Sequence, residues 1–201
     1  LEKGAKIVKE INRKVAEIIG INPAARTTCV KPSGNASVLL QTASGIHAEH
    51  SDMYIRNVQM NKESEITQAI IKSNPYMVEE SVWSANGTDV VVSFPIIPKK
   101  GSLLKDDLIG VKHLELVAKA QKHWVNAGTN EDLCADKGIR HNVSNTILVD
   151  DWDDVEKYVF KNRHSFAGIS FLSMMGDKDF NQAPNTAVID AKKMVKEYDS
   201  A

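Results

Sequence analysis

The stretch Arg26-Thr-Thr-Cys-Val-Lys-Pro-Ser-Gly-Asn-Ala-Ser-Val-Leu-Leu40 carries most of what this sequence says about its fold. The β-prone run at residues 27–30 predicts a strand, the Pro-Ser-Gly-Asn turn predicts a tight loop, and the segment from Ala36 onward predicts a helix. The amino terminus of a helix presents unpaired N–H groups and the positive end of the helix dipole, and both attract phosphate. The stretch therefore predicts a phosphate-binding loop between a strand and a helix.

Residues within the loop suit this purpose. Gly34 lets the main chain approach an anion without a Cβ in the way, and Ser33, Asn35 and Ser37 add short polar side chains. The alternative is an ordinary strand–turn–helix with a Ser or Asn cap. The string is neither a Walker A loop nor a Gly-x-Gly-x-x-Gly fingerprint, so the local pattern leaves both interpretations open.

Length and composition indicate a globular protein. The chain has 201 residues, of which 42% are hydrophobic and 25% charged, enough for one substantial domain with a core. The formal net charge of −1 does not favour a nucleic-acid-binding surface, so a phosphate site must be local. No apolar run has the length of a membrane span, and no signal peptide opens the chain. The chain starts without Met inside a predicted helix, and we interpret it as a piece of a larger protein.

Cysteine and histidine patterns do not predict a metal site. Cys29 and Cys134 lie far apart without a Cys-x-x-Cys pair, which favours a reducing, cytoplasmic setting without disulfides. We expect Cys29 to be buried in a strand and Cys134 to lie in an exposed loop. His47 and His50 stand three apart, but no suitably spaced ligand completes their set. His113, on a predicted helix, is interpreted as a surface or packing residue.

Periodicity along the chain predicts alternating helices and strands. Helices are expected at residues 3–19, 63–73, 108–126, 152–160 and 186–198, and the apolar face of the first is expected to pack on a core. Strands are expected at residues 53–60, 77–83, 89–94, 141–149 and 165–172, with a turn at Asn86-Gly87 and a loop or insertion at residues 127–140. Such alternation is typical of parallel β/α units, whose sites lie at the carboxyl ends of the strands.

A set of sequence blocks also resembles a known family. The blocks are Thr28-Cys-Val-Lys-Pro-Ser-Gly-Asn-Ala-Ser37, Ser44-Gly-Ile-His47, Tyr54-Ile-Arg56, Val92-Ser-Phe-Pro95, Asn142-Val-Ser-Asn-Thr-Ile147, Gly168-Ile-Ser-Phe-Leu172 and Gln182-Ala-Pro184. In this order they resemble the adenosylcobalamin-dependent (class II) ribonucleotide reductases, closest to the monomeric ribonucleoside-triphosphate reductase type. The resemblance runs from about residue 5 to residue 190.

The resemblance implies a fold and a site. The fold is a ten-stranded α/β barrel of two five-stranded halves, and residues 1–201 would be a fragment of that single catalytic domain, from its carboxyl-terminal part. The family's Pro-Ser-Gly-Thr-type loop binds the substrate phosphates, a role that falls here on Pro32, Ser33, Gly34, Asn35, Ala36 and Ser37. Asn35 replaces the usual Thr. His47 and Arg56 are further candidates for lining the site.

The resemblance also implies a reaction. The ribose 2′-hydroxyl of a ribonucleotide is replaced by hydrogen in deoxyribonucleotide biosynthesis, with adenosylcobalamin as cofactor and a thioredoxin-like reductant for the full-length enzyme. The family's Asn-x-Cys-x-Glu loop and terminal cysteine pair have no match here, so neither Cys29 nor Cys134 is assigned a catalytic role. Alternatives are a class I-type reductase or other radical enzyme on the same barrel, or a non-catalytic phosphate- or nucleotide-binding module.

Overall fold

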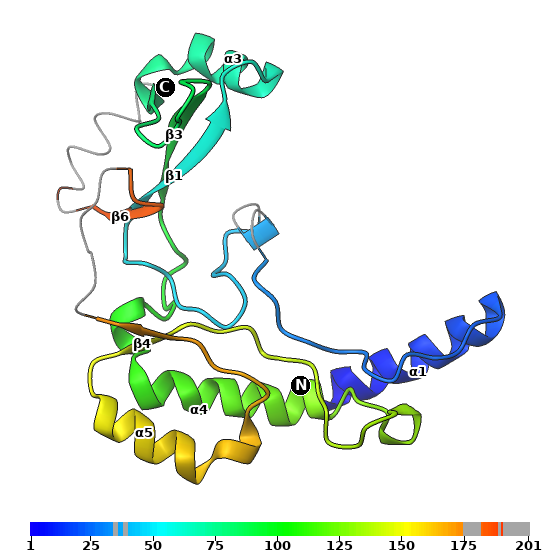
Figure 1. Ribbon diagram of the computed structural model, residues 1–201. Helices are drawn as coiled ribbons and strands as arrows, with labels where there is room; N and C mark the ends of the chain where they lie inside the picture. The colour runs from blue at the N-terminus through cyan, green and yellow to red at the C-terminus, as the bar shows by residue number, and fades with distance from the viewer. Residues whose placement is uncertain (34–35, 38–39, 175–181, 189, 191–201) are drawn as a thin grey trace. The chain divides into compact units, whose positions relative to one another are not determined.

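Two compact units share the chain. A computed structural model describes residues 1–33, 36–37, 40–174, 182–188 and 190 (Figure 1). The first unit comprises Leu1–Ala48 and Asp106–Gly176, and the second comprises Glu49–Lys105 and Asp177–Ala201. Both contain helices and strands, so the fold is mixed α/β.

Helices around a small parallel sheet build the first unit. Strands β4 (Ile147–Val149) and β5 (Phe171–Ser173) pair in parallel, connected by α5 (Trp152–Lys161). Helix α4 (Gly110–Ala120) continues into a π-helical segment, Gln121–Asn126, and lies beside α5 and β4 (Figure 1). The core side chains come from these elements: Leu114, Val117, Ala120, Val125, Val143, Ile147, Val149 and Val155. The predicted parallel β/α unit is therefore confirmed in this part of the chain.

Helix α1 (Glu2–Ile19) forms as predicted and ends at Gly20, whose φ of 73° is left-handed. The prediction that its apolar face packs on a core is wrong. Ile7, Ile11 and Val15 are 47%, 54% and 46% exposed, whereas Ala5 and Ala16 are buried. Helix α1 lies against the π-helical segment, and small side chains permit that close approach.

An antiparallel sheet with strand order β2-β3-β1-β6 dominates the second unit. Its long central pair is β1 (Tyr54–Asn61) and β3 (Asp89–Ile96), in register from Tyr54 opposite Ile96 to Asn61 opposite Asp89. The edge strands are β2 (Val78–Glu80) and β6 (Asn185–Ala187), and the short helices are α3 (Glu65–Ser73) and the 3₁₀ turn Pro75–Met77. The prediction of parallel units is wrong for this sheet.

The antiparallel direction of β2 and β3 has a local cause. The turn predicted at Asn86-Gly87 is present, with Gly87 at a φ of 67°, and it lies between the antiparallel strands β2 and β3. A short connection of this kind returns the chain antiparallel to itself, whereas a parallel crossover needs a dozen or more residues.

Other predicted elements are shorter than expected or differ in type. Residues 27–30 form no strand and pair only through isolated bridges of Arg26 with Thr129 and of Val30 with Val143. The strands predicted at 141–149 and 165–172 shrink to β4 and β5. The predicted loop at 127–140 contains one 3₁₀ turn, Glu131–Leu133. Thr186 and Ala187 belong to β6 rather than to the predicted helix at 186–198, most of which lies outside the described residues.

Among the described residues, none of the helices is both long enough and apolar enough to span a membrane.

Candidate functional site

The main chain leading to the predicted phosphate loop is held against the end of the long helix of the first unit. The Thr28 hydroxyl donates to the Trp124 carbonyl at 2.7 Å, and Trp124 Nε1–H donates to the Cys29 carbonyl at 3.0 Å. Thr28 is buried, and a Cβ at Gly128 would overlap its side chain. Glycine at 128 therefore permits the close approach that fixes residues 28 and 29.

The loop itself is exposed at Pro32, Ser33 and Ala36, whereas Ser37 is buried. Ala36 and Ser37 are helical, as predicted for the start of a helix. The Ser33 amide donates to the Ser44 hydroxyl at 3.1 Å, and the Ala36 amide donates to the Ser33 carbonyl at 3.1 Å. The expectation of unpaired amides is therefore wrong for these two residues. Gly34 and Asn35 lie outside the described residues.

A turn at residues 44–47 packs on the entry to this loop. Gly45 has a φ of 64°, and a Cβ there would lie 3.0 Å from the Lys31 carbonyl oxygen. Through the Ser44 hydroxyl, the same turn accepts the Ser33 amide. Backbone contact and hydrogen bond together join the turn to residues 31–33.

His47 uses both ring nitrogens within the first unit. Its Nδ1 lies 2.9 Å from the Ser44 carbonyl, and its Nε2 accepts the Thr146 amide at 3.1 Å. A carbonyl only accepts and an amide N–H only donates, so this pair of partners defines the neutral tautomer with hydrogen on Nδ1. His47 therefore links the turn to the segment entering β4.

His113 of α4 also binds the turn at residues 44–47. Its Nε2–H donates to the Ile46 carbonyl at 3.0 Å, and its ring meets that of His47 edge-on with centroids 5.8 Å apart. The ring is 3% exposed, and this burial lowers the pKa of His113 below its ordinary value. The His113 imidazole is therefore suited to act as a neutral hydrogen-bonding group at physiological pH.

Arg56, the other predicted site residue, belongs to the second unit. It lies on β1, opposite Phe94 of β3 and Asn185 of β6. Nearby, the Tyr54 hydroxyl donates to the buried carboxylate of Glu49 at 2.9 Å. Burial, followed by this bond, raises the pKa of Tyr54 to about 12, so the phenol stays protonated at physiological pH.

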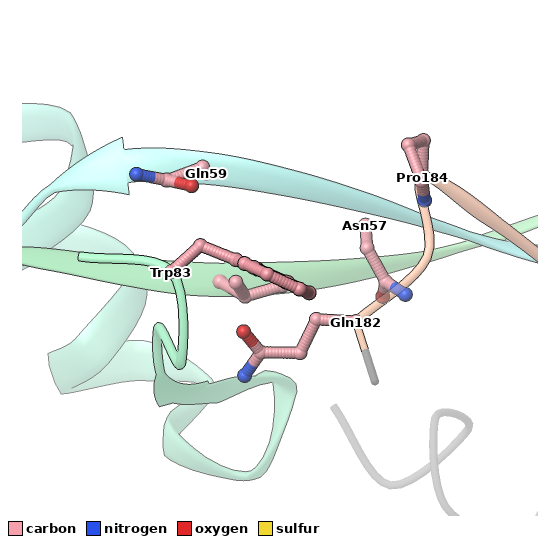
Figure 2. Close-up of a pocket in the computed structure, with 6 residues that line it drawn as sticks. Asn57, Gln59, Trp83, Gln182 and Pro184 are labelled. Carbon is pink, nitrogen blue, oxygen red and sulfur yellow. The ribbon is translucent and has the colours of Figure 1, made fainter. Parts of the chain in front are cut away.

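A cavity of about 430 Å³ lies in the second unit between β1, β3 and the segment before β6 (Figure 2). Trp83 and Pro184 form apolar walls, and three amide side chains line the rest. Gln182 binds Glu79, Glu80 and Val82, and Asn57 donates to the Ala183 carbonyl. These amides are engaged in holding the walls together, and the cavity includes none of the predicted site residues.

The cysteines are placed opposite to expectation: Cys29 is exposed and Cys134 is buried. The Thr28 side chain points inward, where its hydroxyl donates to the Trp124 carbonyl, and the adjacent Cys29 faces outward. The buried Cys134 thiol lies 3.3 Å from the Asn130 carbonyl oxygen. Among the residues that the structure describes, no group of three or more His, Cys, Asp or Glu is arranged to hold a metal ion.

Sequence reasoning missed Ser44 and the role of His113. Ser44 lies in a run of small residues without a distinguishing pattern. His113 lay on a predicted helix, but helical periodicity does not show that its ring binds the carbonyl of Ile46, 67 positions away. The Ser44-Gly-Ile-His47 block was the only signal pointing to this turn.

One solved structure has a similar fold. The chain superposes with a TM-score of 0.70 and 19% identity on a B12-dependent (class II) ribonucleotide reductase, over 99% of this chain and 27% of that one. At that identity the likeness establishes the fold. No family model matches the chain.

Sequence relatives point to the same class more narrowly. A protein of Dictyostelium discoideum named a probable adenosylcobalamin-dependent ribonucleoside-triphosphate reductase is 32% identical over 123 residues, which are 61% of this chain and 16% of that protein. The adenosylcobalamin-dependent ribonucleoside-triphosphate reductase of Euglena gracilis is 26% identical over 94% of this chain, and that of Levilactobacillus brevis is 23% identical over 92%.

The chain spans about a quarter of the length of the latter two relatives, 24% of each. The resemblance to adenosylcobalamin-dependent ribonucleotide reductases that the sequence blocks indicated is confirmed by these relatives.

Proposed function

We propose that this chain is part of an adenosylcobalamin-dependent ribonucleoside-triphosphate reductase, which converts ribonucleotides to 2′-deoxyribonucleotides by a radical mechanism. The observation that carries the proposal is similarity along 94% of the chain to the Euglena gracilis reductase, together with a fold match over 99% of the chain. A module that had borrowed only a phosphate loop would match over that loop alone.

Within that enzyme, both units belong to one catalytic α/β barrel. The parallel pair β4 and β5 with the intervening α5 is the kind of unit from which such a barrel is built. The antiparallel sheet of the second unit would then be an elaboration of the same domain.

The proposed share of this chain in function is to hold the substrate phosphates at residues 32–37. The exposure of Pro32, Ser33 and Ala36 and the helical conformation that Ala36 and Ser37 adopt support this role. Because the amides of Ser33 and Ala36 already have acceptors, the phosphate contacts of these residues would come from the exposed Ser33 hydroxyl. Gly34 and Asn35 remain candidates through the resemblance alone.

The described residues do not by themselves fit the cofactor. The cavity in the second unit and one of about 410 Å³ beside α5 have the volume of drug-sized ligand sites, and a corrin with its nucleotide arm is much larger. Adenosylcobalamin is therefore proposed from the relatives, and no step is assigned to residues of this chain toward it. A thioredoxin-like reductant and a cytoplasmic location belong to the same proposal.

The experiment is an assay of the full-length protein that carries this chain. We expect conversion of a ribonucleoside triphosphate to its 2′-deoxy product with adenosylcobalamin and a dithiol, and none without the cofactor. A protein that binds ribonucleotide but yields no deoxy product under both conditions would instead be a binding module. Turnover without cobalamin would contradict the class II assignment.

A further inference from the structure

A chain of short contacts runs from the core of the first unit to the proposed phosphate loop. At its base, His113 lies on α4 among core residues and is 3% exposed. Its Nε2–H reaches the Ile46 carbonyl, and the edge of its ring meets His47. A buried ring on a packed helix has little freedom to move, so the carbonyl it binds is also fixed.

His47 adds a second attachment from a different element. Its Nε2 accepts the amide of Thr146, the residue directly before β4, and its Nδ1–H closes the turn onto the Ser44 carbonyl. The turn at residues 44–47 is therefore held from α4 through His113 and from the residue directly before β4 through His47.

The same turn sets the position of the loop. The Ser44 hydroxyl accepts the Ser33 amide, and Gly45 lies so close to Lys31 that any side chain at 45 would displace that residue. The position of residues 31–33 therefore depends on that of the turn, and the position of the turn depends on His47 and His113.

We propose that His47 and His113 are positioning residues that fix the phosphate loop through the turn at residues 44–47, without touching the substrate. Both nitrogens of His47 have protein partners, so its ring does not need a ligand to be satisfied. This inference rests on the proposed phosphate role of residues 32–37 and names the groups that hold residues 31–33 at the entry to that loop.

The test separates the two attachments of His47 in the full-length enzyme. His47→Ala removes both. In His47→Gln, the side-chain oxygen reaches the position of Nε2 and can still accept the Thr146 amide. In His47→Asn, the shorter side chain can replace only the donor at Nδ1. We expect His47→Ala to raise KM for the ribonucleoside triphosphate about three- to tenfold, the equivalent of roughly one hydrogen bond, with kcat changed less than about twofold.

His47→Gln should restore KM more fully than His47→Asn, because the Thr146 bond is the one that reaches another element. His164, an exposed residue of the same unit, provides the matched control, and His164→Ala should leave both constants unchanged. A merely structural role would lower the active fraction, and therefore kcat, at an unchanged KM.

If His47→Ala does not fold, Ser44→Ala and Ser44→Thr test only the hydrogen bond between the Ser44 hydroxyl and the Ser33 amide. Ser44→Ala should raise KM, and Ser44→Thr, which keeps the hydroxyl, should restore it.

Gly34→Val tests the loop itself. A raised KM for Gly34→Val with unchanged KM for the His47 and Ser44 variants overturns the positioning proposal and leaves the proposed function standing. An unchanged KM in all of them removes the phosphate role, and the positioning proposal with it.

Discussion

A buried histidine makes folding sensitive to pH, and His113 is the clearest case here. Burial lowers its pKa below the ordinary value of 6.5, and the nearby His47 acts in the same direction, while the bond to the Ile46 carbonyl opposes both. The folded chain therefore takes up this proton less readily than the unfolded chain. The contribution to stability is fully present above pH 6.5 and is lost as the pH falls through the lower, folded value.

We therefore predict that the free energy of unfolding decreases as the pH falls below about 6.5 and that His113→Gln makes this decrease shallower, because glutamine can donate to Ile46 but does not titrate. Urea unfolding between pH 7.5 and 5, at closely spaced pH values, measures the slope. His164→Gln is the control, since it makes the same replacement at an exposed histidine of the same unit. Equal slopes for wild type and His113→Gln would contradict the prediction.

Single residues also show where sequence reasoning stops. The strand predicted at residues 27–30 placed Cys29 inside, but the segment pairs only by isolated bridges, and it is the Thr28 hydroxyl that turns inward to the Trp124 carbonyl. The partner that decides this orientation is 96 positions away, beyond the reach of any local pattern.

At the scale of elements, helix α5 shows how the residue before a helix determines where the helix begins. The Asp151 carboxylate accepts the amides of Asp153 and Asp154 at 2.9 and 3.1 Å, and acidic residues occupy the first turn. These amides have no partner within the helix, so the cap supplies one.

We predict that Asp151→Ala lowers the free energy of unfolding by about 0.5–2 kcal/mol, the usual effect of losing a cap. Asp151→Asn keeps an acceptor at the same place and should cost only a few tenths, chiefly through the lost charge at the helix amino terminus. Chemical denaturation of the three proteins at one pH measures both effects. Equal losses for Ala and Asn would mean that charge, not the hydrogen bond, carries the stabilisation.

Helices and turns could be predicted from the sequence where the residues that determine them lie close together in the chain. α3, α5 and the turn at Gly87 follow from caps and turn residues, and each forms close to its expected place. The partners of β1 are not set locally: β1 pairs with β3 and also with β6, which lies more than 120 residues further along the chain. For the same reason the sequence predicted a phosphate loop and His47 as site residues, but it did not predict the hydrogen bonds that Ser44 and His113 make to the loop entry and to the turn.

At the scale of the whole molecule, exposed apolar side chains stand out. In the first unit, Trp152, Phe160 and Phe171 are 52%, 72% and 38% exposed and line the cavity beside α5. On α1, Ile7, Ile11 and Val15 recur every four residues along one side. Contiguous exposed apolar surface of this kind usually binds another surface, and the chain spans only about a quarter of its relatives (24%).

The apolar side of α1 can be tested alone. We predict that the isolated chain associates with rising concentration and that the triple variant Ile7→Gln, Ile11→Gln, Val15→Gln reduces this association. Glutamine retains good helix propensity, and these side chains are about half exposed, so the free energy of unfolding should change by less than about 1 kcal/mol. Sedimentation velocity over a hundredfold concentration range measures association, and circular dichroism measures helix content.

The opposite side of the same helix gives the control. Ala5 and Ala16 are 0% and 3% exposed, so Ala5→Gln forces a larger polar side chain into a packed contact and should destabilise the chain without relieving association. If the triple variant associates as strongly as the wild type while remaining folded, the apolar side of α1 is not the surface responsible. The aromatic surface formed by Trp152, Phe160 and Phe171 would then be the next to replace, because these side chains are also exposed and line one cavity.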